Sequence, residues 1–305
     1  MNFPENGLNL RLEFFKFIYK RQLIWYKRFR LSQPFPWTID PILTKYKILN
    51  VYRELDKGTL YIIDKLNYIK NHESLFINIL FYRFFNKFGL YENLNITPFE
   101  RFDLVLKNQL NKKFKMEKNR GKAIFNDAYL IGGNKTNEPK YSYILNILSK
   151  IDNSLITKIK NSSSPHNSLK LIQEIQNVGP FLAYEIWTDL TYFDFFAQKW
   201  TDNDFVNIGP GAKWGLEIIA KGNLRKNEQL NMLNLLHKEQ EAVLPRINKS
   251  INEELAWNTI SYKKAYSNIP FLSLRNIEHS LCEFRKYWNI KNNKGKRRLF
   301  KHGKR

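Results

Sequence analysis

The stretch LIQEIQNVGPFLAYEIWTDL, residues 171–190, has apolar residues at helical spacing on both sides of a glycine-proline pair. Spacings of three and four residues place the apolar side chains of each half on one helix face. Between the halves, Gly179 can adopt the positive-φ conformation that ends a helix, and Pro180 suits the first turn of the next helix. The stretch therefore predicts two helices joined by a tight hairpin turn.

A turn of this kind leaves backbone N–H groups without helical partners at the start of its second helix, where the helix dipole is positive. Such a turn binds a phosphate without reading base sequence. We therefore predict that Val178, Gly179 and Phe181 contact the DNA backbone. An ordinary turn between two packed helices is the alternative, because Val-Gly-Pro alone is a weak signal.

The rest of the chain also has helical periodicity, which predicts an all-α protein. Residues 1–290 are expected to form a single domain, or two lobes of one domain, and residues 291–305 a mobile basic tail with eight Lys or Arg and no acid. The predicted helices cover residues 8–30, 41–56, 74–90, 99–111, 119–130, 141–159, 167–177, 181–190, 227–243 and 273–287.

The charge of the chain favours a polyanionic partner. Its 50 Lys and Arg against 28 Asp and Glu give a net charge of +22, which would attract DNA. A lysine-rich composition that reflects an AT-rich genome is the alternative. One cysteine and five scattered histidines predict neither a disulfide nor a metal site, and no cofactor is expected. Because no 18-residue apolar run occurs, we expect a cytoplasmic protein without a membrane partner.

The segment after the hairpin adds a candidate for chemistry. The hairpin resembles the helix–hairpin–helix of DNA base-excision glycosylases, in which a catalytic aspartate follows. Here Asp202 and Asp204 follow in KWTDNDFV, with Asp204 lying 25 residues after Gly179. A fixed carboxylate could stabilise the positive charge that develops on deoxyribose when an N-glycosidic bond breaks. The alternative role for Asp204 is to cap a helix ahead of Phe205.

The glycosylase resemblance also bears on the mode of cleavage. Bifunctional members carry a Schiff-base lysine two positions after the last glycine of the hairpin, where this chain has Phe181. The resemblance therefore implies a monofunctional enzyme that leaves an abasic site.

Five blocks in the same order resemble the family named after α-glutamyl/putrescinyl-thymine pyrophosphorylase. The resemblance implies an all-α, helix–hairpin–helix glycosylase-like fold with helical lobes beside a DNA-binding cleft, and a role with hypermodified bases. This sequence differs from the family pattern at Lys47, where arginine is expected. The blocks are RQLIWYKRF...PFPWTIDPILTKYKILNVYRELD, FYRFFN at 81–86, VGPFLAYEIWTDL, the segment 202–212 that ends in GPGA, and LRNIEHSLCEFRKY.

A pocket for an everted base is predicted from residues in two of these blocks. Asp40 and Pro41 are read as a helix N-cap and first helical residue, so that Tyr46, Asn50 and Arg53 would share a helix face. An everted base needs an aromatic platform and hydrogen-bonding groups. Buried hydrogen bonds that join helices are the alternative role for this stripe. The predicted pocket residues are Trp37, Tyr46, Asn50, Arg53, Arg83 and Asn86.

Two further segments are predicted to contact phosphates. Gly209 and Gly211 of GPGA could bring backbone N–H groups close to a phosphate at a helix start. Arg21 and Arg28 lie in a stretch that mixes basic and aromatic residues, as DNA-gripping surfaces do. A simple turn and an amphipathic surface helix are the respective alternatives.

The leading hypothesis from the sequence is a monomeric, monofunctional DNA glycosylase that excises a 5-substituted pyrimidine from double-stranded DNA carrying modified bases, in defence against phage. The alternative is a transferase that joins an amino acid or polyamine to the 5-methylene of thymine and displaces pyrophosphate. A third hypothesis is a DNA-binding module without catalytic activity.

Overall fold

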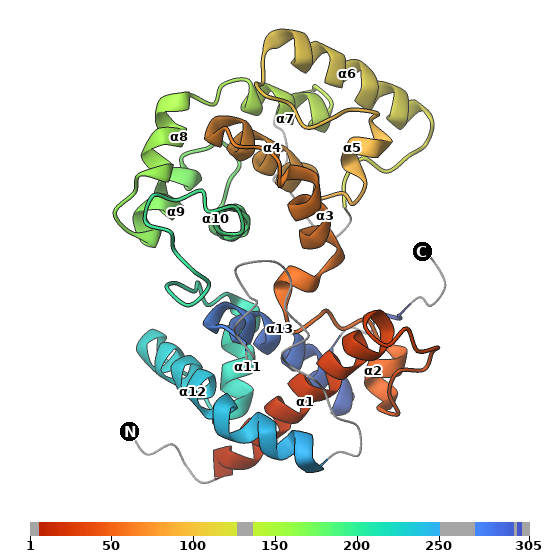
Figure 1. The fold of residues 1–305 in the computed structure, drawn as a ribbon, viewed down its shortest axis with the longest axis vertical. Helices are drawn as coiled ribbons and strands as arrows, with labels where there is room; N and C mark the ends of the chain where they lie inside the picture. The colour runs from red at the N-terminus through yellow and green to blue at the C-terminus, as the bar shows by residue number, and fades with distance from the viewer. Residues whose placement is uncertain (1–5, 127–136, 251–271, 296–297, 301–305) are drawn as a thin grey trace. The chain divides into compact units, whose positions relative to one another are not determined.

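A computed structural model describes residues 6–126, 137–250, 272–295 and 298–300. These residues form helices joined by turns and loops, with one isolated antiparallel bridge between Tyr46 and Leu299, so the all-α prediction is confirmed for them (Figure 1). Backbone contacts divide the chain into two compact units. Unit 1 comprises residues 1–56 and 202–305, and unit 2 comprises residues 57–201.

Unit 1 has an aromatic core around its first helix. Phe14, Phe17 and Phe284 are almost fully buried, and the rings of Phe14 and Phe284 meet edge to face with centroids 5.3 Å apart. Burying large aromatic side chains is the main favourable contribution to such a core. The helices of unit 1 are α1 (Asn6–Phe29), α2 (Pro41–Lys45), the 3-10 helix η1 (Arg53–Leu55), α11 (Pro210–Ala220), α12 (Lys226–Ser250) and α13 (Leu274–Lys291).

Unit 2 is built around α4, whose sequence HESLFINILFYRFF is apolar on nearly every face. A helix of this kind is stable only when other helices cover it, and α3, α7, α8 and α10 all pack on α4. The helices of unit 2 are α3 (Lys57–Leu66), α4 (His72–Phe85), α5 (Leu90–Asn93), α6 (Leu104–Asn119), α7 (Lys140–Leu148), α8 (Asn153–Lys160), α9 (Pro165–Gln173) and α10 (Pro180–Thr191).

The predicted helix over 41–56 is wrong beyond its first turn. Asp40 caps α2 as predicted, and its Oδ1 accepts from the N–H groups of Ile42 and Leu43. Tyr46 then turns to extended backbone at φ −112° and ψ 149°. The amide of Asn50 donates to Leu55 O at 2.9 Å and so holds a loop in place of a helix. Local side-chain hydrogen bonds of this kind compete with helical ones.

Two other predicted helix boundaries move because of capping residues. Asp103 accepts from Leu106 N–H at 2.9 Å, so α6 begins at residue 104 and not at 99. The predicted helix over 141–159 is two helices, since Asp152 caps α8. Of the predicted helix over 119–130, only residue 119, the last residue of α6, is helical as far as residue 126, and residues 127–130 lie outside the described part. Helix α3 lies in a segment where the sequence analysis placed none.

Two glycines allow α11 to approach α13 closely. A Cβ at Gly215 would lie 2.5 Å from the carbonyl oxygen of Leu281, and one at Gly211 would lie 2.6 Å from the Sγ of Cys282. The first contact is with backbone, which cannot move without displacing α13. Gly215 is therefore a position where packing excludes a side chain.

Gly215→Ala is expected to lower the free energy of unfolding by about 1–3 kcal/mol, because it overpacks the α11–α13 contact. Gly222→Ala is the matched control, since a Cβ there meets nothing within 4 Å. Denaturant unfolding of both variants measures the difference, and equal stabilities would contradict the packing role of Gly215.

Candidate functional site

The hairpin predicted from the sequence is present in unit 2 between α9 and α10. The indole Nε1 of Trp187 donates to Ser168 Oγ at 2.9 Å and joins the two helices. The positive φ predicted for Gly179 is wrong: its φ is −80°, and Asn177 adopts the left-handed conformation at φ 64°. Gly179 is the N-cap of α10, and no side chain caps that end.

The surface of this turn suits contact with a large ligand. Gly179 and Pro180 are exposed, and Phe181 is 64% exposed, whereas Val178 is buried beneath the turn. The start of α10 carries the positive end of the helix dipole and no acidic residue in its first turn. The turn therefore keeps an exposed helix start without a side-chain cap, whereas the side chain of Val178, one of the predicted contact residues, is buried.

The two candidate carboxylates lie in unit 1 and differ in environment. Asp204 is exposed, and the alternative that it caps a helix at Phe205 is wrong, because α11 begins only at Pro210 with Gly209 as its N-cap. Asp202 is 5% exposed, and its Oδ2 has no hydrogen-bond partner among the described residues. The backbone carbonyl of Asp202 accepts from Arg275 N–H at 3.2 Å, which fixes it at the start of α13.

A buried charged cluster surrounds Asp202. We define it as Glu54, Asp202, Arg275 and Asn276, each at most 5% exposed. The amide of Asn276 donates to both carboxylate oxygens of Glu54, at 3.1 and 3.3 Å. Burial is the main cause that raises the pKa of Glu54 to about 7, and the charge of Asp202 adds to the shift. Unit 1 thus holds a carboxyl group that titrates near neutral pH.

The sequence analysis missed three members of this cluster. Arg275 and Asn276 lie in the LRNIEHSLCEF block, and Glu54 lies in the YRELD block, but the sequence does not show that these two segments meet. The signal that could have found them is the clustering of ionisable residues inside two apolar blocks. The contact between Glu54 and the start of α13 is a tertiary contact, which periodicity does not reveal.

A second network fixes two of the predicted site residues. The guanidinium of Arg21 donates to Ile48 O at 3.1 Å and to Asn50 Oδ1 at 2.8 Å, while Asn50 Nδ2 donates to Asp56 Oδ1 at 3.0 Å. Burial lowers the pKa of Arg21 to about 10. These contacts favour the alternative reading of the stripe, in which Asn50 joins structural elements.

The other predicted pocket residues of unit 1 have separate surroundings. The indole Nε1 of Trp37 donates to Gln33 O at 2.7 Å. Residues 298–300 pair with the segment that includes Tyr46, through Lys47 N–H to Arg298 O at 2.8 Å, so this part of the predicted basic tail is held in place. The backbone N–H of Arg53 donates to Asn276 Oδ1 at 2.9 Å.

Arg83 and Asn86 belong to unit 2. Arg83 is 5% exposed, and its guanidinium donates from Nε and Nη2 to the two carboxylate oxygens of Asp189 at 2.5 and 2.6 Å. Its Nη1 donates to Glu185 Oε2 at 2.9 Å. Asn86 ends α4 in the left-handed conformation at φ 45°. Arg83 therefore has its charge compensated inside unit 2, by α10.

The GPGA turn in unit 1 also has internal partners. Gly209 N–H donates to Glu278 Oε1 at 3.3 Å, which places a carboxylate where a phosphate was predicted. Gly211 packs against Cys282, as described above. Close packing accounts for the glycines of this turn.

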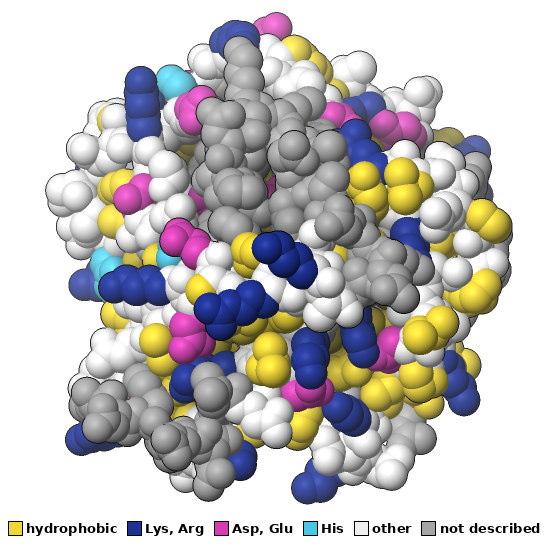
Figure 2. Space-filling view, turned by 60° about the horizontal axis from the view of Figure 1, so that its bottom comes forward, with side chains coloured by type: hydrophobic (Ala, Val, Ile, Leu, Met, Phe, Trp, Pro, Cys, Tyr) yellow, Lys and Arg dark blue, Asp and Glu magenta, His cyan; other side chains and the backbone are white. Residues whose placement is uncertain are grey.

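A basic and aromatic surface lies at the end of α1. The guanidinium of Arg28 lies over the rings of Phe29 and Trp37, 4.7 and 5.0 Å from their centroids, and Arg30 lies over Trp25 at 5.5 Å. Phe29 is 56% exposed. Cation–π pairs hold an arginine beside an aromatic face, a combination found on surfaces that bind nucleic acid. Lys and Arg side chains, dark blue, are spread over the face of the molecule that Figure 2 shows.

Comparison with known proteins assigns a family. The family model described as 5-hmdU DNA kinase, helical domain, matches residues 9–297. The chain belongs to this family. A curated relative, the 5-hmdU DNA kinase of Bacillus phage SP10, is 29% identical over an alignment that covers 94% of this chain and 46% of the relative. The chain thus spans about half the length of that relative. No solved structure matches the chain.

The family overturns the reactions predicted from the sequence. A kinase is a phosphotransferase, so the hydrolytic glycosylase is wrong, and so is the transferase that displaces pyrophosphate. The predicted role in defence depends on base excision, so it is wrong as well. The resemblance to enzymes of hypermodified bases is confirmed, but the pyrophosphorylase family is replaced by the helical domain of a 5-hmdU DNA kinase.

The described residues contain neither a membrane-spanning helix nor a cluster of metal-binding side chains. No helix among them is long and apolar enough to cross a membrane. No group of three or more His, Cys, Asp or Glu side chains among them is arranged to hold a metal ion.

Proposed function

We propose that this chain binds DNA containing 5-hydroxymethyl-2′-deoxyuridine (5-hmdU) and presents the 5-hydroxymethyl group for phosphorylation. The observation that carries the proposal is the family match over residues 9–297. The net charge of +22 supports it, because phosphate neutralisation dominates the affinity of proteins for DNA.

We assign DNA binding to this chain, and not the binding of the phosphate donor. Kinases of the P-loop class bind the donor nucleotide through G-x-x-x-x-G-K-[ST], and the sequence contains no such motif. The chain also covers only 46% of the relative that is named for the complete activity. The phosphate donor site is therefore not assigned to residues of this chain.

The chemistry of the substrate changes what the DNA-binding surface must do. A substituent at C5 of uracil takes the place of the thymine methyl group, which faces the major groove. The N-glycosidic bond lies inside the DNA duplex, whereas a 5-hydroxymethyl group projects into the major groove. Eversion of the base into the predicted pocket is therefore not a requirement of this reaction, although enzymes that act on a base commonly use it.

Two surfaces are proposed to contact the DNA. The α9–α10 turn offers the uncapped start of α10 to a phosphate, with the exposed ring of Phe181 beside it. The end of α1 offers Arg28 and Arg30 on aromatic platforms. Both contacts are independent of sequence, as expected of an enzyme whose target is defined by a base modification.

Phe181→Ser is expected to weaken binding to a 5-hmdU duplex about tenfold, because an aromatic side chain that contacts a nucleotide contributes on the order of 1–3 kcal/mol. Leu104→Ser is the matched control, since Leu104 is 66% exposed in the same unit and Phe181 is 64% exposed. Fluorescence anisotropy at constant salt measures both affinities. If the two variants bind like the unmodified chain, the α9–α10 turn does not contact DNA.

A further inference from the structure

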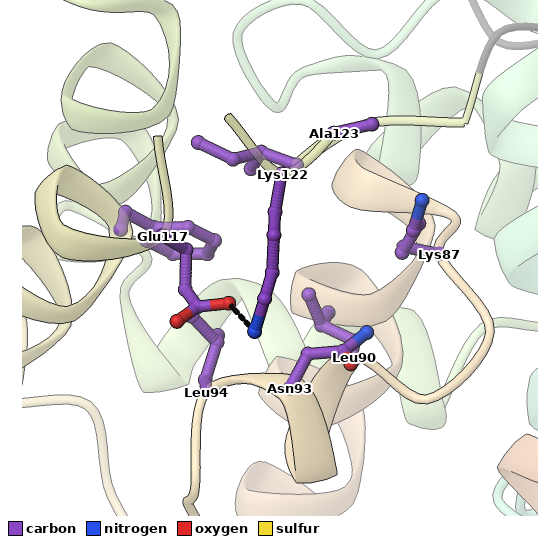
Figure 3. A pocket seen from close by; sticks show the side chains of 9 residues that line it. Lys87, Leu90, Asn93, Leu94, Glu117, Lys122 and Ala123 are labelled. Carbon is purple, nitrogen blue, oxygen red and sulfur yellow. Dashed lines mark ion pairs between the residues drawn. The ribbon is translucent and has the colours of Figure 1, made fainter. Parts of the chain in front are cut away.

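Unit 2 contains a cavity of about 250 Å³ that is separate from the α9–α10 turn (Figure 3). It is formed by residues from the α4–α5 turn, helix α5, the end of α6 and the segment that follows α6. Its apolar wall consists of Leu90, Leu94 and Phe114, which are at most 4% exposed. A concave apolar surface with a few polar groups is the usual form of a small-molecule site.

The polar groups of this cavity carry an excess of positive charge. The Nζ of Lys122 lies 2.7 Å from Glu117 Oε2 (Figure 3). Arg120, which does not line the cavity, reaches Glu117 Oε1 at 2.8 Å, so the carboxylate among the described lining residues already has two cations. Lys87 also lines the cavity and is half-buried. Among the described residues, no carboxylate or hydrogen-bond acceptor pairs with the Lys87 ammonium. A partly desolvated cation without a partner favours an anionic ligand.

Phe114 and Asn93 also line the cavity and indicate what the uncharged part of the ligand would contact. Phe114 has its ring stacked with Phe85, centroids 4.5 Å apart, and with Tyr141 at 5.6 Å. Two rings thus stack with Phe114, and the ring edge is the electropositive part of an aromatic side chain. The side chain of Asn93 lines the cavity and makes no hydrogen bond with another described residue.

We propose that this cavity binds a small organic phosphate, with the phosphate at Lys87 and Lys122 and a heterocyclic body against Leu90, Leu94 and the edge of Phe114. The volume of about 250 Å³ falls just below the roughly 300–1,000 Å³ typical of ligand sites. It therefore suits a ligand of the size of a nucleoside monophosphate and not a larger cofactor. This site is independent of the proposed DNA contacts.

The probe is thymidine 5′-monophosphate, titrated into the full chain by isothermal calorimetry, with thymidine and inorganic phosphate as separate arms. Binding of the monophosphate, with at least tenfold weaker binding of both fragments, is the expected result. Thymidine binding as tightly as the monophosphate would overturn the anion requirement. Inorganic phosphate binding as tightly would overturn the role of the apolar wall.

Lys87→Gln is expected to weaken binding of the monophosphate about 10- to 100-fold, because a charge-assisted hydrogen bond is lost. Lys107→Gln is the matched control: Lys107 is also half-buried in unit 2 but does not line the cavity. Unchanged affinity in Lys107→Gln together with the loss in Lys87→Gln supports the site. Equal affinity in both variants, or no heat with the unmodified chain at millimolar monophosphate, overturns it.

Discussion

Arg83→Met is expected to lower the free energy of unfolding by about 3–5 kcal/mol, the usual cost of removing one partner from a buried ion pair. The side chain of Asp189 is 0% exposed and that of Glu185 is 14% exposed, so the variant leaves two carboxylates with little access to water. Part of the loss should return in Arg83→Met/Asp189→Leu, which removes the more deeply buried charge as well. Denaturant unfolding of the single and double variants measures both effects.

The control for Arg83 is Arg101→Met in the same unit. The side chain of Arg101 is 85% exposed, and its Nε lies 3.2 Å from Asp103 Oδ2. Exposed pairs contribute little, so a change within about 0.5 kcal/mol is expected. If Arg83→Met is as stable as Arg101→Met but binds DNA more weakly, Arg83 contacts substrate, as the sequence suggested, and does not hold α4 to α10.

Glu54→Gln is expected to change the pH dependence of stability. The folded-state pKa of about 7 lies above the ordinary value of 4.5, so the folded protein binds a proton more tightly than the unfolded chain does. Stability from this group is fully present below pH 4.5, falls as pH rises from 4.5 to 7, and stays lost above 7. The difference between the folded and unfolded pKa values corresponds to a change of about 3 kcal/mol in the free energy of unfolding.

Glutamine has no carboxyl proton to lose, so the variant should gain stability relative to the unmodified chain when pH rises from 5 to 8. Glu241→Gln, which removes one exposed charge from unit 1, is the control and should show no comparable gain. Urea unfolding at the two pH values measures the effect. A Glu54→Gln difference that is the same at pH 5 and pH 8 would contradict a buried, neutral carboxyl group in the cluster.

The parts of the fold that the sequence predicts are those fixed by local chemistry. Asp40 before Pro41 predicts the start of α2, and the apolar periodicity around Gly179 predicts α9 and α10, because caps and amphipathic faces are local properties. Periodicity predicts a helix after Lys45, where the structure has a loop. The loop is held by the hydrogen bond from Asn50 Nδ2 to Leu55 O, which composition does not show.

The site was harder to predict than the fold for a physical reason. A hairpin turn and a basic surface indicate DNA contact, but every enzyme that handles DNA needs them, so they do not select a reaction. The preference for Asp204 over Asp202 rests on a spacing shared with glycosylases, whereas the carboxylates of the buried charged cluster are those of Glu54 and Asp202. Their proximity arises from the packing of η1 and the start of α13, which lie far apart in the sequence.

Recognition of 5-hmdU in DNA is the property that we propose for this chain. The most direct test compares its dissociation constants for two duplexes that differ only in one base, 5-hmdU or thymine, at the same salt concentration. We expect salt-dependent binding of both and about tenfold tighter binding of the 5-hmdU duplex, the amount that one additional hydrogen bond to the hydroxyl group supplies. Equal affinities, or no binding at low salt, would contradict the claim.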